Sequence, residues 1–244
     1  MSTVPEALLQ VTDLNYVYAD GTEALRGVHL NIARGEKVGL IGPNGSGKST
    51  LLMCLGGLFA GHGMVRLNGA EMNPTRIPEQ RGSVGLVFQS PDDQLFMPTL
   101  ADDLAFGPIN LGLTDEQVRD RVALVAEQMG LTPLLDRPPH HLSLGQQRSA
   151  AIAAVLAMHP ALLLLDEPSS NLDPRARRQL IGVLEPMATA MLIAAHDLAL
   201  IGRLCGRVLL IDEGRIVADG PTAEIMGDKD LMEQHGLESW REQE

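Results

Sequence analysis

One nine-residue segment, Gly42 to Thr50, restricts the fold of this chain more than any other feature. It follows the apolar run Val38 to Ile41 and precedes an apolar helical stretch at 51–55. Glycine has no Cβ atom, so Gly45 and Gly47 allow the backbone to turn tightly and to direct successive N–H groups at phosphate oxygens. The N-terminus of the following helix adds its dipole. The segment therefore predicts a strand, a phosphate-binding loop and a helix in that order.

The side chains of this segment have separate expected roles. Lys48 is placed to reach the β and γ phosphates of a nucleotide, and the Ser49 hydroxyl to ligate magnesium. An ordinary glycine-rich turn before a helix is the alternative, but it would not require this combination of residues in this context. We expect nucleotide contacts along the whole segment, at Gly42, Pro43, Asn44, Gly45, Ser46, Gly47, Lys48, Ser49 and Thr50.

Short apolar runs elsewhere predict an α/β fold with a central, mostly parallel sheet. Each run is too short for a helix and is bounded by glycine, proline or charge, as buried parallel strands are. The runs are Val38–Ile41, Val84–Phe88, Leu162–Leu165, Met191–Ala195 and Val208–Ile211. Near the N-terminus, strand patterns at Leu8–Tyr18, Val28–Ile32 and Val65–Leu67 are separated by Asp-Gly and Asn-Gly turn signals. These predict an antiparallel β layer beside the main sheet.

A polar, helix-rich block at 90–150 predicts a helical subdomain inserted into one domain that spans 1–244. Within it, Thr114 and Gln117 form a capping box, apolar residues follow at helical spacing, and Gly130 ends the helix. Toward the end, 208–218 predicts a hairpin. The polar tail, 221–244, predicts one or two helices.

A pair of carboxylates ends one of the apolar runs. Asp166 and Glu167 follow Leu162–Leu165, at the carboxyl edge where ligands of open α/β sheets bind. Asp166 is expected to hold magnesium. Burial should raise the pKa of Glu167 and suit it to positioning or deprotonating a water molecule. The alternative is a solvated strand end.

Composition excludes several classes of protein. The chain has 244 residues, 45% hydrophobic and 20% charged, which favours a packed core over disorder. Its formal charge of -12 opposes sequence-independent nucleic-acid binding. Two distant cysteines suggest neither a disulfide framework nor a zinc site. The start lacks a secretory signal, and Pro160 interrupts the uncharged stretch 149–165 that comes nearest to a membrane span.

Further motifs accompany the loop and the acidic strand end, in a fixed order. Taken together they resemble the ATP-binding cassette family, the nucleotide-binding subunits of ABC transporters, over about residues 8–220. Gln89 resembles the Q-loop glutamine, Leu142–Gln146 the signature sequence, Ser170–Asp173 the D-loop and His196 the switch histidine. Tyr18 lies where the family has the aromatic residue that stacks on adenine.

This resemblance implies an ATPase of the P-loop NTPase fold, with ATP and Mg²⁺ as its ligands. Lys48, Gln89, Glu167 and His196 would then be the catalytic residues, and Ser49, Gln89 and Asp166 would hold the metal. Glu167 would polarise the attacking water and His196 would contact the γ phosphate. A register slip of two residues would put Tyr16 in place of Tyr18.

The signature also has a physical interpretation. Ser143 begins an expected helix through Met158, and Gly145 permits close backbone approach, so this helix end is a second anion site. The family resemblance implies a head-to-tail dimer in which Ser143, Gly145 and Gln146 of one subunit close on ATP held by the other. Leu144 stands where the family most often has glycine, and Asn171 where alanine is frequent.

Three nearby stretches are similar to the cassettes of energy-coupling-factor importers, and within that group to the cobalt and nickel branch. They are Phe88–Phe96, 103–108 and 110–113. That resemblance implies a peripheral protein on the cytoplasmic face of the membrane. Its partners would be a second cassette, identical or different, an integral membrane coupling protein and a substrate-binding membrane subunit. A biotin or other vitamin importer, a non-transport cassette ATPase and a binding module without catalysis are the alternatives.

Two groups of possible metal ligands lack a recognisable ligand spacing, so we assign them no metal. They are His140 and His141 with Asp136, and the acidic group Asp92, Asp93, Asp102 and Asp103.

Overall fold

The computed structural model describes residues 7–72, 82–238 and 240, and its centre is a six-stranded sheet. Its strands are, in spatial order, β10 (Arg215–Pro221), β9 (Arg207–Asp212), β3 (Lys37–Ile41), β8 (Ala190–Ala194), β7 (Leu162–Asp166) and β6 (Val84–Val87). All neighbours are parallel except β10 and β9, which form a hairpin. The mostly parallel sheet and the hairpin predicted from the sequence are both confirmed. β6 ends one residue earlier than expected, because the Phe88 N–H donates to the Gln94 side chain instead of to a strand.

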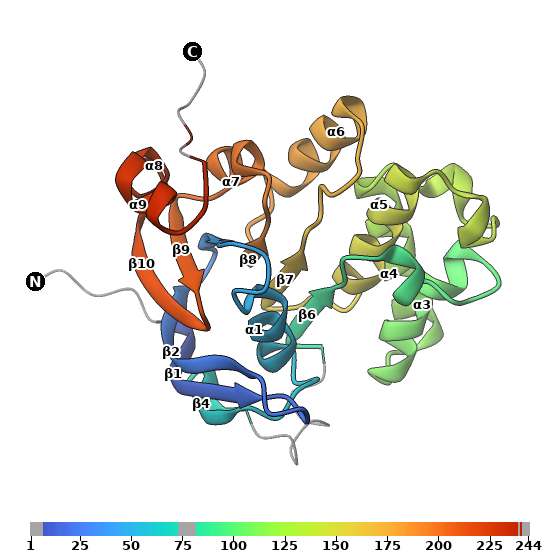
Figure 1. Ribbon diagram of the computed structural model, residues 1–244. Helices are drawn as coiled ribbons and strands as arrows, with labels where there is room; N and C mark the ends of the chain where they lie inside the picture. Colours follow the sequence, from blue (N-terminus) through green and yellow to red (C-terminus); the bar gives the residue numbers. More distant parts are fainter. Residues whose placement is uncertain (1–6, 73–81, 239, 241–244) are drawn as a thin grey trace, which may run out of the picture.

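The N-terminal strands form a separate antiparallel sheet, as predicted (Figure 1). Its order is β2 (Glu23–Ala33), β1 (Ala7–Val17), β4 (His62–Leu67) and β5 (Ala70–Glu71). The β1–β2 hairpin turns at Asp20-Gly21, and Asn68-Gly69 joins β4 to β5. β2 starts five residues before the expected Val28 because its first half pairs with β1 as far as Val17.

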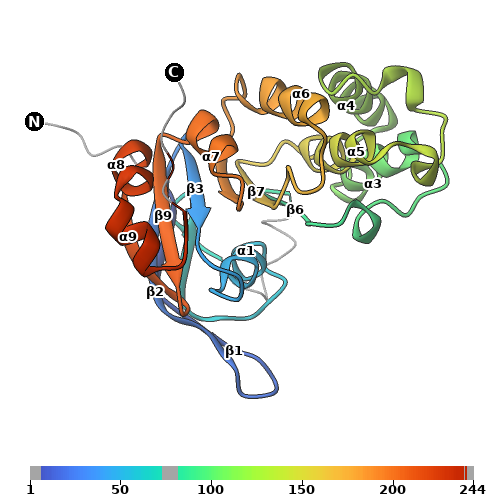
Figure 2. The ribbon, with the colours of Figure 1, turned by 45° about the horizontal axis from the view of Figure 1, so that its top comes forward.

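Three longer helices lie between β6 and β7 in the sequence and gather at one end of the molecule (Figures 1 and 2). They are α3 (Leu100–Asn110), α4 (Asp115–Gln128) and α5 (Leu144–Leu156), with short 3₁₀ turns at Pro91–Asp93, Thr132–Leu134 and Pro139–His141. The capping box of α4 is formed on both sides, and Gly130 at φ 66° follows its end. α5 ends two residues before the expected Met158, since a residue next to proline disfavours helix and His159 adopts φ 54° ahead of Pro160.

The remaining helices cover the two faces of the central sheet. α1 (Lys48–Leu55) packs with the N-terminal sheet on one face. α6 (Pro174–Leu184) and α7 (Leu198–Leu204) share the other face with the insertion. β7 is buried along its whole length, and its leucines alternate between the two cores: Leu163 and Leu165 on the α5 side, Leu162 and Leu164 on the α1 side.

The tail forms two short helices, α8 (Thr222–Gly227) and α9 (Lys229–Gln234), in agreement with the prediction for 221–244; residues 239 and 241–244 of that range lie outside the described residues. Trp240 packs against Gly202 of α7, where a Cβ atom would come within 2.3 Å of the indole. α8 lies against β9 and β10, and α9 packs on α8, at the end of the sheet opposite to the insertion (Figure 2).

Candidate functional site

The loop between β3 and α1 has the geometry that its glycines predict. Gly45 and Gly47 adopt φ 77° and 107°, in the left-handed region that side chains disfavour. A Cβ atom on Gly47 would lie 2.6 Å from the Ala24 carbonyl oxygen, so no larger residue fits without a shift of the backbone. Gly47 is also the N-cap residue of α1 and offers no side chain to cap the helix, which leaves the first N–H groups of α1 for an anion.

Lys48 folds back over this loop. Its Nζ donates to the carbonyl oxygens of Gly42 at 2.8 Å and Pro43 at 2.9 Å, and the side chain is buried. Burial lowers the pKa of Lys48, while the carboxylates Glu167 and Asp166 oppose that shift. The ammonium group therefore faces the two acidic residues across the loop, at the place where phosphate groups of a nucleotide would lie.

The structure distinguishes the two candidate aromatic residues of β1. The Tyr16 ring already stacks on Phe59, with ring centroids 5.0 Å apart and an interplanar angle of 6°. Tyr18 touches both of those rings by its edge, is 37% exposed, and shares a 2.8 Å hydrogen bond between its hydroxyl and the Thr50 hydroxyl. Tyr18, joined to α1 in this way, is therefore the ring available to a base.

The two carboxylates lie at the carboxyl end of β7, as expected. Asp166 is 5% exposed, and its Oδ1 atom has no hydrogen-bond partner among the described residues. Burial raises its pKa against the opposing effects of Ser49, Lys48 and Arg148. Burial also raises the pKa of Glu167. Glu167 adopts φ 48°, a strained conformation for a residue with a side chain. An orphaned, buried carboxylate oxygen next to a hydroxyl is an oxygen-rich donor set of the kind Mg²⁺ prefers.

The neighbouring strand ends bring the other expected residues to the same edge. The His196 N–H donates to Glu167 Oε2 at 3.3 Å, and its Nε2 lies 3.5 Å from Glu167 Oε1. Gln89 follows β6, which pairs with β7 in parallel, so the exposed Gln89 lies beside the acidic pair. The structure thus brings Lys48, Glu167 and His196 together at the carboxyl end of the sheet, and Gln89 follows the end of the neighbouring strand.

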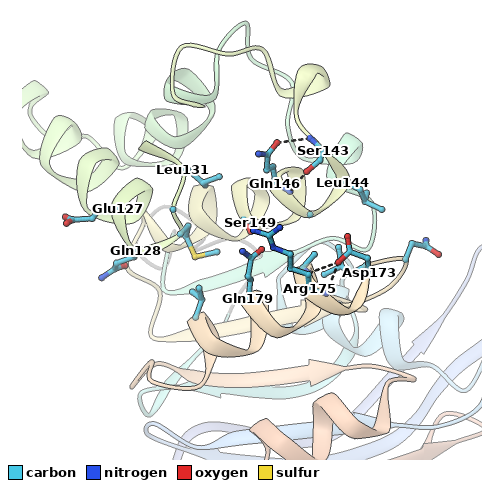
Figure 3. A pocket seen from close by; sticks show the side chains of 17 residues that line it. Glu127, Gln128, Leu131, Ser143, Leu144, Gln146, Ser149, Asp173, Arg175 and Gln179 are labelled. Atoms are coloured by element: carbon cyan, nitrogen blue, oxygen red, sulfur yellow. Dashed lines mark hydrogen bonds between the residues drawn. The ribbon is translucent and has the colours of Figure 1, made fainter. Parts of the chain in front are cut away.

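The signature residues lie elsewhere. Ser143 is the N-cap of α5 and forms a complete capping box with Gln146, in which the Ser143 N–H donates to Gln146 Oε1 at 2.9 Å. Ser143, Leu144, Gly145 and Gln146 line a cavity of about 800 Å³ between α4, α5 and α6 (Figure 3). None of the phosphate-loop residues lines this cavity. Because the start of α5 and the phosphate loop of the same chain do not share this cavity, we expect them to be two separate half-sites.

The two departures from the family pattern have visible consequences. Leu144 is 40% exposed at the first position of α5 and leaves the helix end uncovered. Asn171 adopts φ 61°, which asparagine tolerates better than most residues. Gly145 is needed for packing, since its Cβ atom would lie 3.0 Å from the Ala176 side chain on α6.

Sequence reasoning missed a group of residues behind the site. Arg177 of α6 forms an ion pair with Asp197, which also caps α7 and accepts a 3.0 Å hydrogen bond from the Ser169 hydroxyl. Burial opposes ionisation of Asp197, but the interactions with Arg177, Leu200 and Ser169 together outweigh it, so the pKa of Asp197 is lowered. Arg148 of α5 is buried behind the acidic pair. No local pattern marks these residues, since each owes its role to partners that are distant in sequence.

Comparisons with known proteins agree on one family. The profile described as "ABC transporter" matches residues 25–170. The energy-coupling factor transporter ATP-binding protein EcfA of Methanothermobacter thermautotrophicus is 40% identical over 236 residues, 94% of this chain and 76% of that protein. The structure of cbiO1 from Clostridium perfringens, described as part of the ABC transporter complex cbiONQ, aligns with a TM-score of 0.82 and 36% identity, covering 93% of this chain and 94% of that one. A dimeric ATP-binding cassette in a post-hydrolysis state, bound to ADP and phosphate, aligns with a TM-score of 0.79 and 25% identity over 88% of this chain and 98% of that one.

Proposed function

Because the chain belongs to the ABC transporter family of ATP-binding cassettes, we propose that it is the ATP-hydrolysing subunit of an energy-coupling-factor importer for cobalt or nickel. Family membership makes it the ATP-binding subunit of an ABC transporter and an ATPase. We propose in addition the type of importer and its cargo. This assignment is supported by the similarity of the chain to an energy-coupling-factor cassette and to a member of a cbiONQ complex.

The observation that carries the ATPase mechanism is the meeting of Lys48, Asp166, Glu167 and His196 at one edge of the sheet. Mg²⁺, when bound, neutralises charge on the β and γ phosphate oxygens, and Ser49 and Asp166 are the residues suited to hold it. Lys48 has loop carbonyls as its partners here and exchanges them for phosphate oxygens.

Glu167 orients the attacking water and accepts its proton, and burial raises the pKa of its carboxyl group. His196 holds the Glu167 carboxylate through its backbone N–H and presents its imidazole to the γ phosphate. Gln89, which follows the next strand end, would help Ser49 and Asp166 to hold the metal. Phosphoryl transfer requires this positioning and charge neutralisation more than covalent chemistry.

The second half-site supports a head-to-tail dimer. Ser143 and the free N–H groups at the start of α5 form an anion-binding helix end that does not line the phosphate loop of its own chain. In a paired arrangement, the Ser143 end of each copy would close on the nucleotide of the other. A similar cassette has been solved as a dimer with ADP and phosphate, which supports the pairing of two copies of this chain.

An apolar groove supports docking of this chain to a membrane subunit, at the cytoplasmic face of the membrane. The groove encloses about 520 Å³ between β6, α3 and α5, and Phe96 and Phe106 meet edge to face at its mouth, 5.0 Å apart. Phe96 is 63% exposed, and Ile109 nearby is 60% exposed. Exposed aromatic residues around a groove are typical of a protein–protein contact. The described residues contain no helix long and apolar enough to span a bilayer.

Co-purification from membranes tests the assignment. We expect a tagged chain to recover a small integral membrane coupling protein and a substrate-binding membrane subunit. Vesicles that contain this complex should take up cobalt or nickel only when ATP and Mg²⁺ are supplied, and a complex with Glu167→Gln should take up neither. Uptake of biotin or another vitamin instead would identify the alternative cargo. Recovery with ribosomes or DNA would overturn the transport assignment.

A further inference from the structure

Arg148 is a buried cation that no step of the proposed ATPase mechanism uses. Arg148 lies on α5, five residues after Ser143, and is only 4% exposed. Its Nη2 atom donates to the Ser170 carbonyl oxygen at 3.2 Å. Its Nε and Nη1 atoms find no hydrogen-bond partner among the described residues. Removing a guanidinium group from water costs several kcal/mol unless nearby opposite charge compensates.

The compensating charges are the two carboxylates of the acidic pair. Burial lowers the pKa of Arg148, while Glu167 and Asp166 oppose that shift, in the same order as they act on Lys48. The charges of Glu167 and Asp166 thus act on both cations. Lys48 is bonded to carbonyl oxygens of the phosphate loop, whereas Arg148 is bonded to the carbonyl oxygen of Ser170, three residues after Glu167.

The segment that Arg148 holds is under backbone strain. Glu167 and Asn171, on either side of Ser170, both have positive φ angles. Such conformations persist only where the surroundings enforce them. From one side the segment is held by the Ser169 hydroxyl, which donates to Asp197, and from the α5 side by the Arg148 bond to Ser170.

We propose that Arg148 is a positioning residue for ATP hydrolysis. Its guanidinium group fixes the segment from Glu167 to Ser170 and supplies an immobile counter-charge behind the acidic pair. It acts within its own chain, on the carboxylates of that chain, although it lies on the helix whose Ser143 end meets the nucleotide of the partner. This inference rests on the proposed function, in which Glu167 positions the attacking water.

Substitution of Arg148 should separate turnover from binding. Arg148→Met should lower kcat by about 10²-fold, the cost of a small misplacement of a catalytic group. The dissociation constant of Mg-ATP should stay unchanged, because no contact of the phosphate loop is lost. Arg148→Lys restores the charge but not the planar fork, so we expect a smaller loss of kcat, about tenfold.

Arg121→Met is the matched control. Arg121 lies on α4 of the same insertion and also has a buried nitrogen atom, Nη1, without a partner, but it faces His159 instead of the acidic pair. The kcat of Arg121→Met should match that of the unsubstituted chain. Unchanged kcat in Arg148→Met, or loss of ATP binding in parallel with kcat, would overturn the inference. If Arg148→Met does not fold, an unchanged kcat in Arg148→Lys overturns it equally.

Mixed dimers locate the effect. When one protomer carries Glu167→Gln, a single competent site remains, and Arg148→Met can be added to either protomer. We expect hydrolysis to slow when Arg148→Met is added to the protomer with intact Glu167. A loss confined to the other protomer would show that Arg148 serves only the signature helix and would contradict our assignment. If the unsubstituted chain binds but does not hydrolyse ATP, the proposed function fails. If the unsubstituted chain hydrolyses ATP and all Arg148 variants do so at the same rate, only the inference about Arg148 fails.

Discussion

At the scale of single residues, burial decides what the acidic pair can do. Asp166 and Glu167 are both withdrawn from water, and for both the largest effect on the pKa is desolvation, which raises it. Asp166 has Ser49 and Lys48 beside it, which favours its charged form and a metal. Glu167 accepts a hydrogen bond from the backbone of His196, and its Oε1 atom, 3.5 Å from His196 Nε2, has no hydrogen bond within the described part of the chain, which favours a water molecule there.

Glu167→Gln tests this division of roles. The amide keeps the size of the side chain but cannot accept a proton, so turnover should fall by about 10²- to 10⁴-fold, the usual contribution of a positioned base. Binding of Mg-ATP should be retained, since Lys48 and the loop amides are untouched. Single-turnover hydrolysis and equilibrium binding measure the two quantities. A variant that hydrolyses at the original rate would remove Glu167 from the role.

Tyr18→Ala tests the adenine contact. Stacking of a base on an aromatic ring contributes about 1–3 kcal/mol, so the dissociation constant of ATP should rise about 5- to 150-fold. The affinity for inorganic triphosphate, which has no base, should be unchanged. Tyr16→Ala is the control, because its ring is already occupied by Phe59. A larger effect in Tyr16→Ala would show that Tyr16, and not Tyr18, is the residue that stacks on adenine.

Residues with a local sequence signature were predictable, and those defined by distant partners were not. The loop glycines and the Asp166-Glu167 pair follow apolar runs, and the structure places them at strand ends. Arg148 has no such signature, because its bond to Ser170 crosses 22 positions of sequence. Asp197 is adjacent to His196, but its pairing with Arg177 depends on how α6 packs against α7.

At the scale of elements, apolar runs and capping residues account for most of the agreement between sequence and structure. The runs at 38–41, 162–165 and 208–211 became β3, β7 and β9, since continuous burial on both faces leaves no polar position within a strand. The ends of elements were less predictable. α5 stops at Leu156, ahead of Pro160, and the second strand is longer than its apolar run because hydrogen bonds to β1 extend it.

Two helices of the insertion begin with the same capping box, which allows a controlled test of Ser143. Ser143→Ala and Thr114→Ala each remove a side-chain acceptor for the third N–H of a helix, and each should lower the free energy of unfolding by about 1 kcal/mol. Only Ser143→Ala should also slow ATP hydrolysis, because the α4 end meets no nucleotide in the proposed dimer. Denaturant unfolding and phosphate release measure the two effects. Equal hydrolysis rates in both variants would contradict the role of the signature helix.

At the scale of the whole molecule, the two half-sites lie on different parts of one chain. The phosphate loop joins the central sheet to α1, whereas the Ser143 end belongs to the insertion at the other end of the molecule (Figure 1). This separation was not derivable from spacing alone, because sequence distance does not say which way α5 points. The dimer was implied by family resemblance, and the structure adds that the Ser143 cavity excludes the loop of its own chain.

Pairing should therefore depend on nucleotide. Each chain carries a formal charge of -12, so two copies repel one another until a local attraction exceeds that repulsion. The attraction available is between the phosphates on one loop and the free N–H groups at the start of α5 of the other copy. With Glu167→Gln to prevent turnover, light scattering should show twice the monomer mass in Mg-ATP and the monomer mass without nucleotide. Adding Ser143→Glu places a carboxylate against the phosphates and should keep the chain monomeric in Mg-ATP, whereas adding Thr114→Ala should not. A dimer that forms equally well without nucleotide, or that survives Ser143→Glu, would mean that some other surface joins the copies.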